Sequence, residues 1–370
     1  MEMIYKYPSC VTIKGYSRSV IQDLYYGEYF FIPNLLCDIL GNINGKTIDD
    51  IIRETDDDRN IINEFICFLK EKDVIYLSEQ QLSFKDLIIE FDYPAKVSNA
   101  IIEIELSNSK LYEIIYQLES LGCEHLQIYI KDVLDLKDYD YIFSNFKNSR
   151  VSSIDIITKY NKKLDNTEIL RRFFNSEKRL FNIIFYDAIK SKKENFDPFG
   201  NKRMLFIKDN LTFKDCGCMH PMNLQNSMSF FTEAQKHNTC LNRKVYIDIE
   251  GNIKNCPAMT KVYGNIKDTK LEEAITKDGF KNLWYVNKDK IDVCKDCEFR
   301  YMCSDCRAFI KDDGNIYSQP SKCNYNPYVC KWDGQEGYVP VEECGTYKKD
   351  KGFVPDKEKI EELNKQIWGE

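Results

Sequence analysis

The placement of cysteine constrains this chain more than any other feature of its sequence. Fifteen cysteines occur in 370 residues, and eleven of them lie between Cys216 and Cys344. The other four are scattered and are expected to be small buried apolar residues: Cys10, Cys37, Cys67 and Cys123. No basic segment followed by an apolar run opens the chain, so the cytoplasm is the expected compartment. Because thiols stay reduced there, the clustered eleven are expected to bind metal rather than to form disulfides.

The composition argues against two classes of partner. The net charge of −7 is unfavourable for a nucleic-acid-binding protein, because a phosphate-binding surface needs concentrated basic residues. No stretch approaches the ~20 apolar residues that a membrane span requires. With 43% hydrophobic and 30% charged residues, the chain has the composition of an ordinary globular protein of two or three domains.

The first segment, residues 1–85, predicts strands or a hairpin followed by short helices and a final strand. One helix is expected to start at Pro33, and a second at the capping box formed by Thr47 and Asp50. A third, over residues 57–72, is amphipathic, with one face predicted as Ile61, Phe65, Phe68 and Leu69. Short helices followed by a β wing suggest a winged-helix-like unit.

The second segment, residues 86–210, alternates between patterns typical of β-strands and patterns typical of α-helices. Its β-rich runs are residues 101–106, 126–131, 151–160 and 180–188, with helical patterns between them. Such repeats predict a parallel sheet with right-handed crossovers, either open or closed into a full or partial barrel. No Gly-rich phosphate loop follows any of these strands.

The clustered cysteines form two pieces. In the first, Cys240 is followed by ten residues, Gly251, four residues and Cys256. The intervening VYIDI-EGN-IKN predicts a hairpin that brings the two cysteines to the same end. The second piece is a Cys-x2-Cys-x5-Cys-x2-Cys run made of Cys294, Cys297, Cys303 and Cys306. Spacing alone allows either a structural zinc site or an iron–sulfur cluster.

The complete order of seven cysteines and one glycine over about residues 235–335 resembles the SPASM domain of peptide-modifying radical SAM enzymes. One departure is that the last pair has two intervening residues instead of three. The resemblance implies two auxiliary [4Fe–4S] clusters. It assigns one cluster to Cys294, Cys297, Cys303 and Cys323, with Cys330 as the second choice for the last ligand. It assigns the other to Cys240, Cys256 and Cys306, with a fourth ligand from Cys216, Cys218, His237 or the substrate.

Radical SAM enzymes carry a Cys-x3-Cys-x2-Cys motif, and no such spacing occurs in this chain. The segment at residues 121–132 resembles a helix–strand junction of that family but lacks its Gly-Gly-Glu. We therefore expect an α/β scaffold that binds no S-adenosylmethionine. Its predicted parts are a winged-helix-like peptide-recognition unit (1–85), a degenerate radical-SAM-like partial parallel barrel (86–210), a cysteine-rich SPASM-like iron–sulfur domain (211–345) and a charged C-terminal helix (346–370).

A SPASM protein without the radical SAM motif resembles the SPASM component of grasp-with-spasm systems. That resemblance implies a precursor peptide and an ATP-grasp ligase as partners, with the leader peptide added as a strand at a sheet edge of the N-terminal unit. Two alternatives stay open: a zinc-stabilised peptide-binding scaffold and a cluster-dependent redox enzyme acting on the peptide. No catalytic residue can be named, since the three histidines (His125, His220 and His237) have no recognisable catalytic context.

Overall fold

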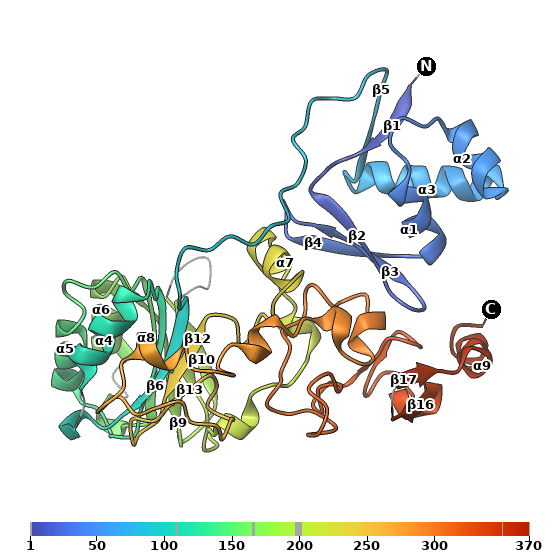
Figure 1. Ribbon diagram of the computed structural model, residues 1–370. Helices are drawn as coiled ribbons and strands as arrows, with labels where there is room; N and C mark the ends of the chain where they lie inside the picture. The colour runs from blue at the N-terminus through green and yellow to red at the C-terminus, as the bar shows by residue number, and fades with distance from the viewer. Residues whose placement is uncertain (1, 109, 165–166, 197–201, 350, 370) are drawn as a thin grey trace. The chain divides into compact units, whose positions relative to one another are not determined.

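The computed structural model describes residues 2–108, 110–164, 167–196, 202–349 and 351–369 (Figure 1). The chain divides into two compact units, each built from separated stretches of sequence. The sheet unit comprises Asp92–Gly217 and Cys240–Trp284, and the second unit comprises Met1–Phe91, Cys218–Thr239 and Tyr285–Glu370. The cysteine-rich part of the sequence is thus shared between the units. Among the described residues, no helix is long and apolar enough to cross a membrane.

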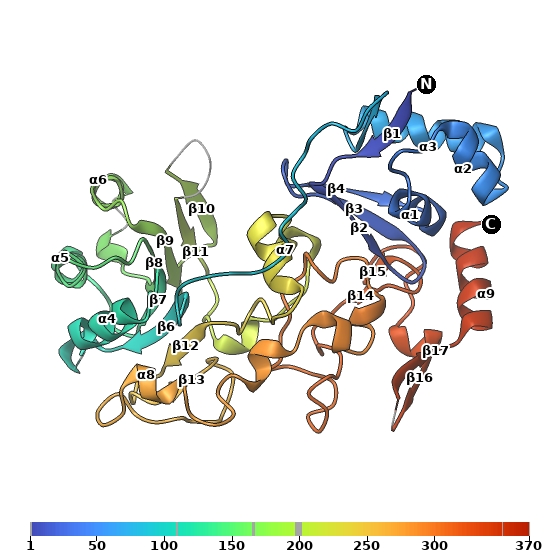
Figure 2. The ribbon, with the colours of Figure 1, turned by 45° about the horizontal axis from the view of Figure 1, so that its top comes forward.

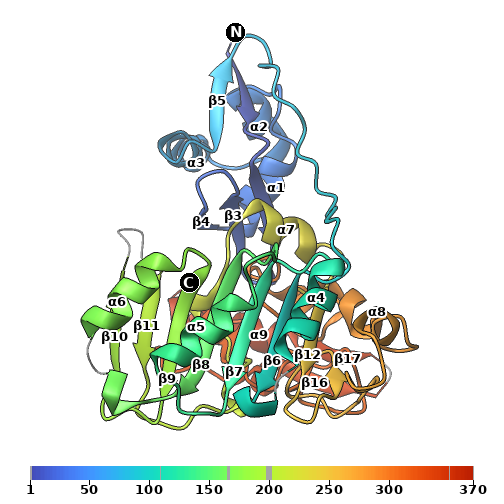
Figure 3. The same cartoon turned by 90° about the vertical axis from the view of Figure 1, so that its left-hand side faces the viewer.

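The sheet unit contains a mixed sheet of eight strands in the order β10-β11-β9-β8-β7-β6-β12-β13. Its four central strands are β6 (Asn99–Ile104), β7 (His125–Ile130), β8 (Ser153–Lys159) and β9 (Leu180–Tyr186), which run parallel as the repeat predicts. Three helices connect them and lie on one face of the sheet: α4 (Leu111–Ser120), α5 (Leu136–Ser144) and α6 (Thr167–Ser176) (Figures 2 and 3).

A row of isoleucines holds the central strands in register. Ile102, Ile128, Ile156 and Ile183 face one another on successive strands and are fully buried. β-Branched side chains suit such cross-strand contacts, because their stiff χ1 angle loses little freedom on a pleated surface. The row makes the core of this sheet almost wholly aliphatic.

The outer strands extend the sheet on both sides. On one side are β11 (Arg203–Phe206), parallel to β9, and β10 (Lys192–Asn195), antiparallel to β11. On the other side are β12 (Lys244–Ile247), parallel to β6, and β13 (Ile253–Lys254), antiparallel to β12. Because β10 and β13 end the order, the described strands form an open sheet rather than a full barrel. The short helix α8 (Leu271–Ala274) follows β13.

The N-terminal part of the second unit has two small sheets and three helices. Its strands are β1 (Met3–Lys6), β2 (Cys10–Lys14), β3 (Ser19–Asp23), β4 (Glu28–Ile32) and β5 (Ile75–Ser78). Its helices are α1 (Asn34–Gly41), α2 (Ile48–Thr55) and α3 (Arg59–Glu71). β2, β3 and β4 form an antiparallel sheet with β4 at one edge, while β1 pairs with β5. The first two strands therefore do not form a hairpin with each other.

The predicted helices of this part are present, with one difference. Thr47 and Asp50 form the expected capping box of α2. In α3 the fully buried stripe is Ile62, Ile66 and Leu69, whereas Ile61 is 43% exposed. Leu69 is therefore buried as predicted, and Phe65 and Phe68 pack partly buried against the same core, whereas the placement of Ile61 on the buried face was wrong.

The rest of the second unit is poor in regular structure. Besides short turns of 3₁₀-helix, its elements are α7 (Met228–Ala234), β14 (Tyr325–Asn326), β15 (Lys331–Trp332), β16 (Gly345–Lys348), β17 (Gly352–Pro355) and α9 (Lys357–Trp368). The antiparallel pairs β14–β15 and β16–β17 are each two-stranded. α9 is the helix predicted near the C-terminal end of the sequence.

Candidate metal centre

Four thiols of the second unit line one small cavity: Cys294, Cys297, Cys303 and Cys323. Cys294 opens a turn of 3₁₀-helix, and the Cys297 N–H donates to the Cys294 carbonyl at 3.1 Å, so a single tight turn presents both thiols. The Cys303 N–H donates to the Phe299 carbonyl at 3.0 Å, which closes the next turn. The arrangement places Cys323, rather than Cys330, with the other three thiols.

Burial controls the protonation of these thiols. It raises the pKa of Cys294 and Cys297 well above the ordinary value and raises that of Cys303 to about 11. At neutral pH the metal-free thiols therefore keep their protons, and a bound metal must displace them. The cavity encloses about 30 Å³, roughly the share of one water molecule in the liquid, so the side chains themselves fill most of it.

The spacing of the ligating groups bears on the kind of centre. Within the described ranges, no three His, Cys, Asp or Glu side chains converge on a point where one metal ion could be held. A tetrahedral zinc site needs four ligands that converge at about 2.3 Å from one ion. A [4Fe–4S] cluster binds its cysteines through separate irons, so its ligands stay further apart. A set of four thiols is the donor set of either kind of centre.

Two further cysteines of this unit lie outside the cavity. Cys330 has a positive φ of 56°, is buried, and its thiol donates to the Pro327 carbonyl at 3.7 Å. Cys344 packs in an apolar cluster, where its sulfur accepts a hydrogen bond from Asn326 Nδ2 at 3.3 Å. Cys306, which the resemblance assigns to the second cluster, is buried in this same unit.

The sheet unit contains the other set of thiols. β12 and β13 form the predicted hairpin, and Gly251 at its turn has φ +88° with no room for a Cβ beside Ile266. Cys240 and Cys256 flank this hairpin, and Lys244 Nζ donates to Cys240 Sγ at 3.5 Å. Burial lowers the pKa of Lys244, but the surrounding thiols of Cys240, Cys256 and Cys216 outweigh this and raise it. Cys216 therefore joins the hairpin cysteines.

Two of the histidines lie in the second unit, and one of them, His237, lines a small pocket together with Cys303. His220 is exposed, and its Nδ1 accepts from the Met222 N–H at 3.2 Å. His237 is half-buried between the rings of Phe91 and Tyr285, at centroid distances of 5.7 and 5.5 Å. Both placements suit structural histidines.

No sequence pattern distinguishes the cations that line the four-thiol cavity from other lysines and arginines of the chain. Its only charged lining residues among those described are Lys288 and Arg300, and neither is matched by an acidic residue in the lining. Arg300 Nε pairs with Asp289 at 3.1 Å outside the cavity wall. Burial lowers the pKa of Lys288, but Cys303 and Asp305 outweigh it and raise the value, so the ammonium stays charged. Both charged side chains in the described lining are therefore cations, whereas Asp305 and Glu298 act from outside it and, beside the larger effect of burial, raise the pKa of Cys294 and Cys297.

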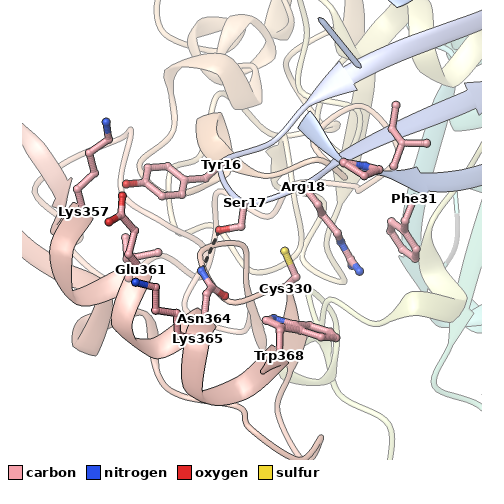
Figure 4. Close-up of a pocket in the computed structure, with 13 residues that line it drawn as sticks. Tyr16, Ser17, Arg18, Phe31, Cys330, Lys357, Glu361, Asn364, Lys365 and Trp368 are labelled. Atoms are coloured by element: carbon pink, nitrogen blue, oxygen red, sulfur yellow. Dashed lines mark hydrogen bonds between the residues drawn. The ribbon is translucent and has the colours of Figure 1, made fainter. Parts of the chain in front are cut away.

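A larger pocket of about 910 Å³ lies in the same unit (Figure 4). It is bounded by the turn before β3, the end of β4 and the helix α9. Arg18 stacks on Phe31 with its guanidinium carbon 3.6 Å from the ring centroid, and Arg18 Nε donates to the fully buried Glu298 at 2.7 Å. Lys357 and Lys365 of α9 add positive charge to the opposite wall. The pocket has the size of a ligand site and combines aromatic with cationic walls.

The edge strand β4 connects this pocket to the four-thiol cavity. Phe31 is 44% exposed on β4, and its ring centroid lies 5.6 Å from that of Phe299. Phe299 lines the cavity beside the thiols, and Tyr29 contacts the same ring at 6.3 Å. An exposed strand edge is therefore separated from the candidate metal centre by a single aromatic ring.

Comparisons with known proteins agree with the cysteine pattern. Residues 239–298 match the model of the SPASM family, described as an iron-sulfur cluster-binding domain. The matched range contains Cys240, Gly251, Cys256, Cys294 and Cys297. The match implies that the chain binds iron–sulfur clusters, as the order of its cysteines predicts.

Solved structures give a weaker comparison. The crystal structure of Streptococcus suis SuiB bound to S-adenosylmethionine aligns with 87% of this chain and 100% of its own, at 12% identity and a TM-score of 0.39. The crystal structure of SuiB bound to the precursor peptide SuiA aligns with 86% and 99%, at 11% identity and a TM-score of 0.37. Likeness at this level says nothing about the reaction. A search of the curated proteins found none similar to the chain.

Proposed function

We propose that this chain is a component of a ribosomal peptide maturation system, which binds a precursor peptide and carries auxiliary [4Fe–4S] clusters without radical SAM chemistry. The observation that carries the proposal is a contrast within the sequence. The cysteine order of a SPASM domain is present and matched over residues 239–298, whereas Cys-x3-Cys-x2-Cys occurs nowhere in the 370 residues. A chain that lacks this motif has no three-cysteine loop to hold a cluster with an iron open to S-adenosylmethionine.

The proposed ligands fall into two sets. Cys294, Cys297, Cys303 and Cys323 hold one cluster, supported by their common cavity. Cys240 and Cys256 belong to the second, and the position of Cys216 beside them supports it as a further ligand. A cluster with an incomplete protein shell supplies an iron that accepts an outside thiolate or amine.

The proposed peptide site is the edge of β4 that pairs with no other described strand. An extended peptide gains main-chain hydrogen bonds at such an edge and side-chain selectivity from neighbouring pockets. Phe31 and Tyr29 provide an aromatic surface there, and the pocket beside Arg18 offers room for a side chain. A peptide added along β4 lies next to Phe299, and hence close to the four-thiol centre.

The proposed partner is an ATP-grasp ligase. The strands of the parallel sheet are followed by no Gly-rich loop that could hold nucleotide phosphates. Activation of a carboxylate by ATP therefore falls to a second protein, and this chain presents the peptide. Two candidates compete with this assignment: a zinc-stabilised scaffold with the same peptide site, and a redox enzyme that modifies the peptide through its clusters.

The first test is the metal and acid-labile sulfide content after anaerobic purification. About eight irons and eight sulfides per chain are expected for two clusters. Zinc without sulfide would favour the scaffold candidate instead. A change in peptide mass produced by the isolated, reduced protein would favour the redox candidate.

The second test measures binding of the peptide encoded beside this gene, by fluorescence anisotropy. We expect Phe31→Glu to weaken binding at least tenfold, or about 1.4 kcal/mol, because it places a charge on the β4 edge. The matched control is Tyr141→Glu on α5, which changes a similarly accessible aromatic residue in the sheet unit. Absence of binding by the unmodified chain would refute the proposal, and equal binding by Phe31→Glu would move the site away from β4.

A further inference from the structure

Lys288 is a buried cation that makes no hydrogen bond to any described acidic side chain. It lies in a short turn of 3₁₀-helix, is only 6% exposed, and lines the four-thiol cavity. Its Nζ has no hydrogen-bond partner among the described residues. An ammonium removed from water without a partner is strongly unfavourable, so such a group normally indicates a missing anion.

The nearest acid does not supply that anion. Asp305 Oδ1 lies 3.9 Å from Lys288 Nζ, which is beyond hydrogen-bond distance. The same Oδ1 accepts from Arg307 at 2.7 Å, and Oδ2 accepts from Asn238 Nδ2 at 2.6 Å. Arg307 already balances the charge of Asp305, and both side chains are almost completely buried. One positive charge therefore remains, and it is on Lys288.

The cavity itself shows where the missing anion belongs. Four cysteines line the same cavity as Lys288, and none of the described residues in its lining is acidic. Four thiolates around a [4Fe–4S] core with two positive charges give a total charge of −2, which becomes −3 on one-electron reduction. This is an anion of the required sign, bound by residues that the buried ammonium already faces.

We propose that Lys288 is the built-in counter-charge of the cluster held by Cys294, Cys297, Cys303 and Cys323, and that it raises the reduction potential of that cluster. The inference rests on the proposed iron–sulfur function and adds a residue that the cysteine pattern does not assign. A fixed positive charge stabilises the reduced cluster more than the oxidised one, because the reduced form carries one more negative charge. Lys288 is thus a positioning and tuning residue rather than a ligand.

The test is a redox titration of the full, cluster-loaded chain, followed by electron paramagnetic resonance. Lys288→Gln removes the charge but keeps an N–H donor, and Lys288→Met removes both. The matched control is Lys290→Met, because Lys290 lies two residues away but is exposed. We expect one midpoint potential to become more negative in both Lys288 variants while the other stays unchanged. The control is expected to match the wild type.

Several outcomes would overturn the inference. An unmoved or more positive potential in both Lys288 variants, at wild-type iron content, refutes it while leaving the clusters in place. A more negative midpoint potential in Lys288→Met alone refutes the counter-charge role, because the loss of a hydrogen-bond donor would then explain the change in potential. If neither variant assembles the cluster, Lys288→Arg decides: restored iron content supports the role of charge, and failure to restore it opposes that role. A wild-type chain that contains no iron removes both this inference and the proposed clusters.

Discussion

Substitution of Cys323 by serine tests the assignment of the four-thiol centre. Cys323 lines the cavity with Cys294, Cys297 and Cys303, so it is in place to bind the fourth iron of their cluster. A serine hydroxyl is a harder and less acidic ligand than a thiol, and iron–sulfur clusters select soft thiolates. We therefore expect Cys323→Ser to lose one whole cluster, which is about four of about eight irons, together with a matching amount of sulfide.

Cys330→Ser is the matched control for this prediction. Cys330 is also buried and lies seven residues further along, but it does not line the cavity. Its thiol makes a long hydrogen bond to the Pro327 carbonyl at 3.7 Å and also interacts with the Tyr325 side chain, and a serine hydroxyl can take the place of the thiol in both. We expect unchanged iron and sulfide, and a change in the free energy of unfolding of no more than about 1 kcal/mol.

The assay measures iron, sulfide and protein on the same anaerobic samples, with thermal unfolding to show that both variants fold. The reasoning is refuted if Cys330→Ser loses about four irons and Cys323→Ser retains them. It is also refuted if both variants keep the wild-type content, because the fourth ligand would then be another group.

The remaining predictions concern the sheet unit. The Tyr139 hydroxyl is fully buried with no hydrogen-bond partner among the described residues, so Tyr139→Phe should stabilise the chain by about 1 kcal/mol in denaturant unfolding. Tyr129→Phe should destabilise the chain by a similar amount, because it loses a 2.8 Å hydrogen bond to a main-chain carbonyl. Gly251→Ala should destabilise the hairpin by about 1–3 kcal/mol, measured by thermal unfolding, and lower the iron content, because φ is +88° there. Burial raises the pKa of Asp248, but the hydrogen bonds from Lys254, at 2.9 Å, and from Asn252 together outweigh burial and lower the pKa. The stability that this carboxylate contributes is therefore present above about pH 4 and is lost as the pH falls further. Asp248→Asn should accordingly show a smaller fall in unfolding temperature below pH 4 than the wild type.

Local patterns were enough to predict the central part of the sheet. The four β-rich runs and the three helices between them have the periodicities of buried strands and amphipathic helices, and each became an element of that type. The sequence could not show that β12 joins the same sheet. β12 is only four residues long, and it pairs with β6, which lies more than a hundred residues earlier in the sequence. Pairing between strands so far apart in the sequence depends on the tertiary fold, which local sequence patterns do not predict.

The same distinction applies to the candidate site. The Cys-x2-Cys spacing predicts that Cys294 and Cys297 share one tight turn, and the family resemblance adds Cys303 to them. All three line the cavity, while their binding of a cluster stays a prediction. Lys288 was not predictable, since it occurs in the sequence NKDKID, which looks like an exposed charged turn. Its neighbour Lys290 is indeed exposed, and only tertiary packing distinguishes the two lysines.

The buried charges of residues 285–345 bear on what stabilises this part of the chain. Lys288, Glu298, Asp305 and Arg307 are all charged and almost completely buried there, while helices and strands are few. Burying charge opposes folding, in contrast to the aliphatic core of the eight-stranded sheet. The apolar clusters around Phe299 and Tyr328 supply part of the free energy that opposes this cost. The proposed cluster would add metal–thiolate bonds, so we expect the metal-free chain to unfold at a lower temperature than the loaded chain.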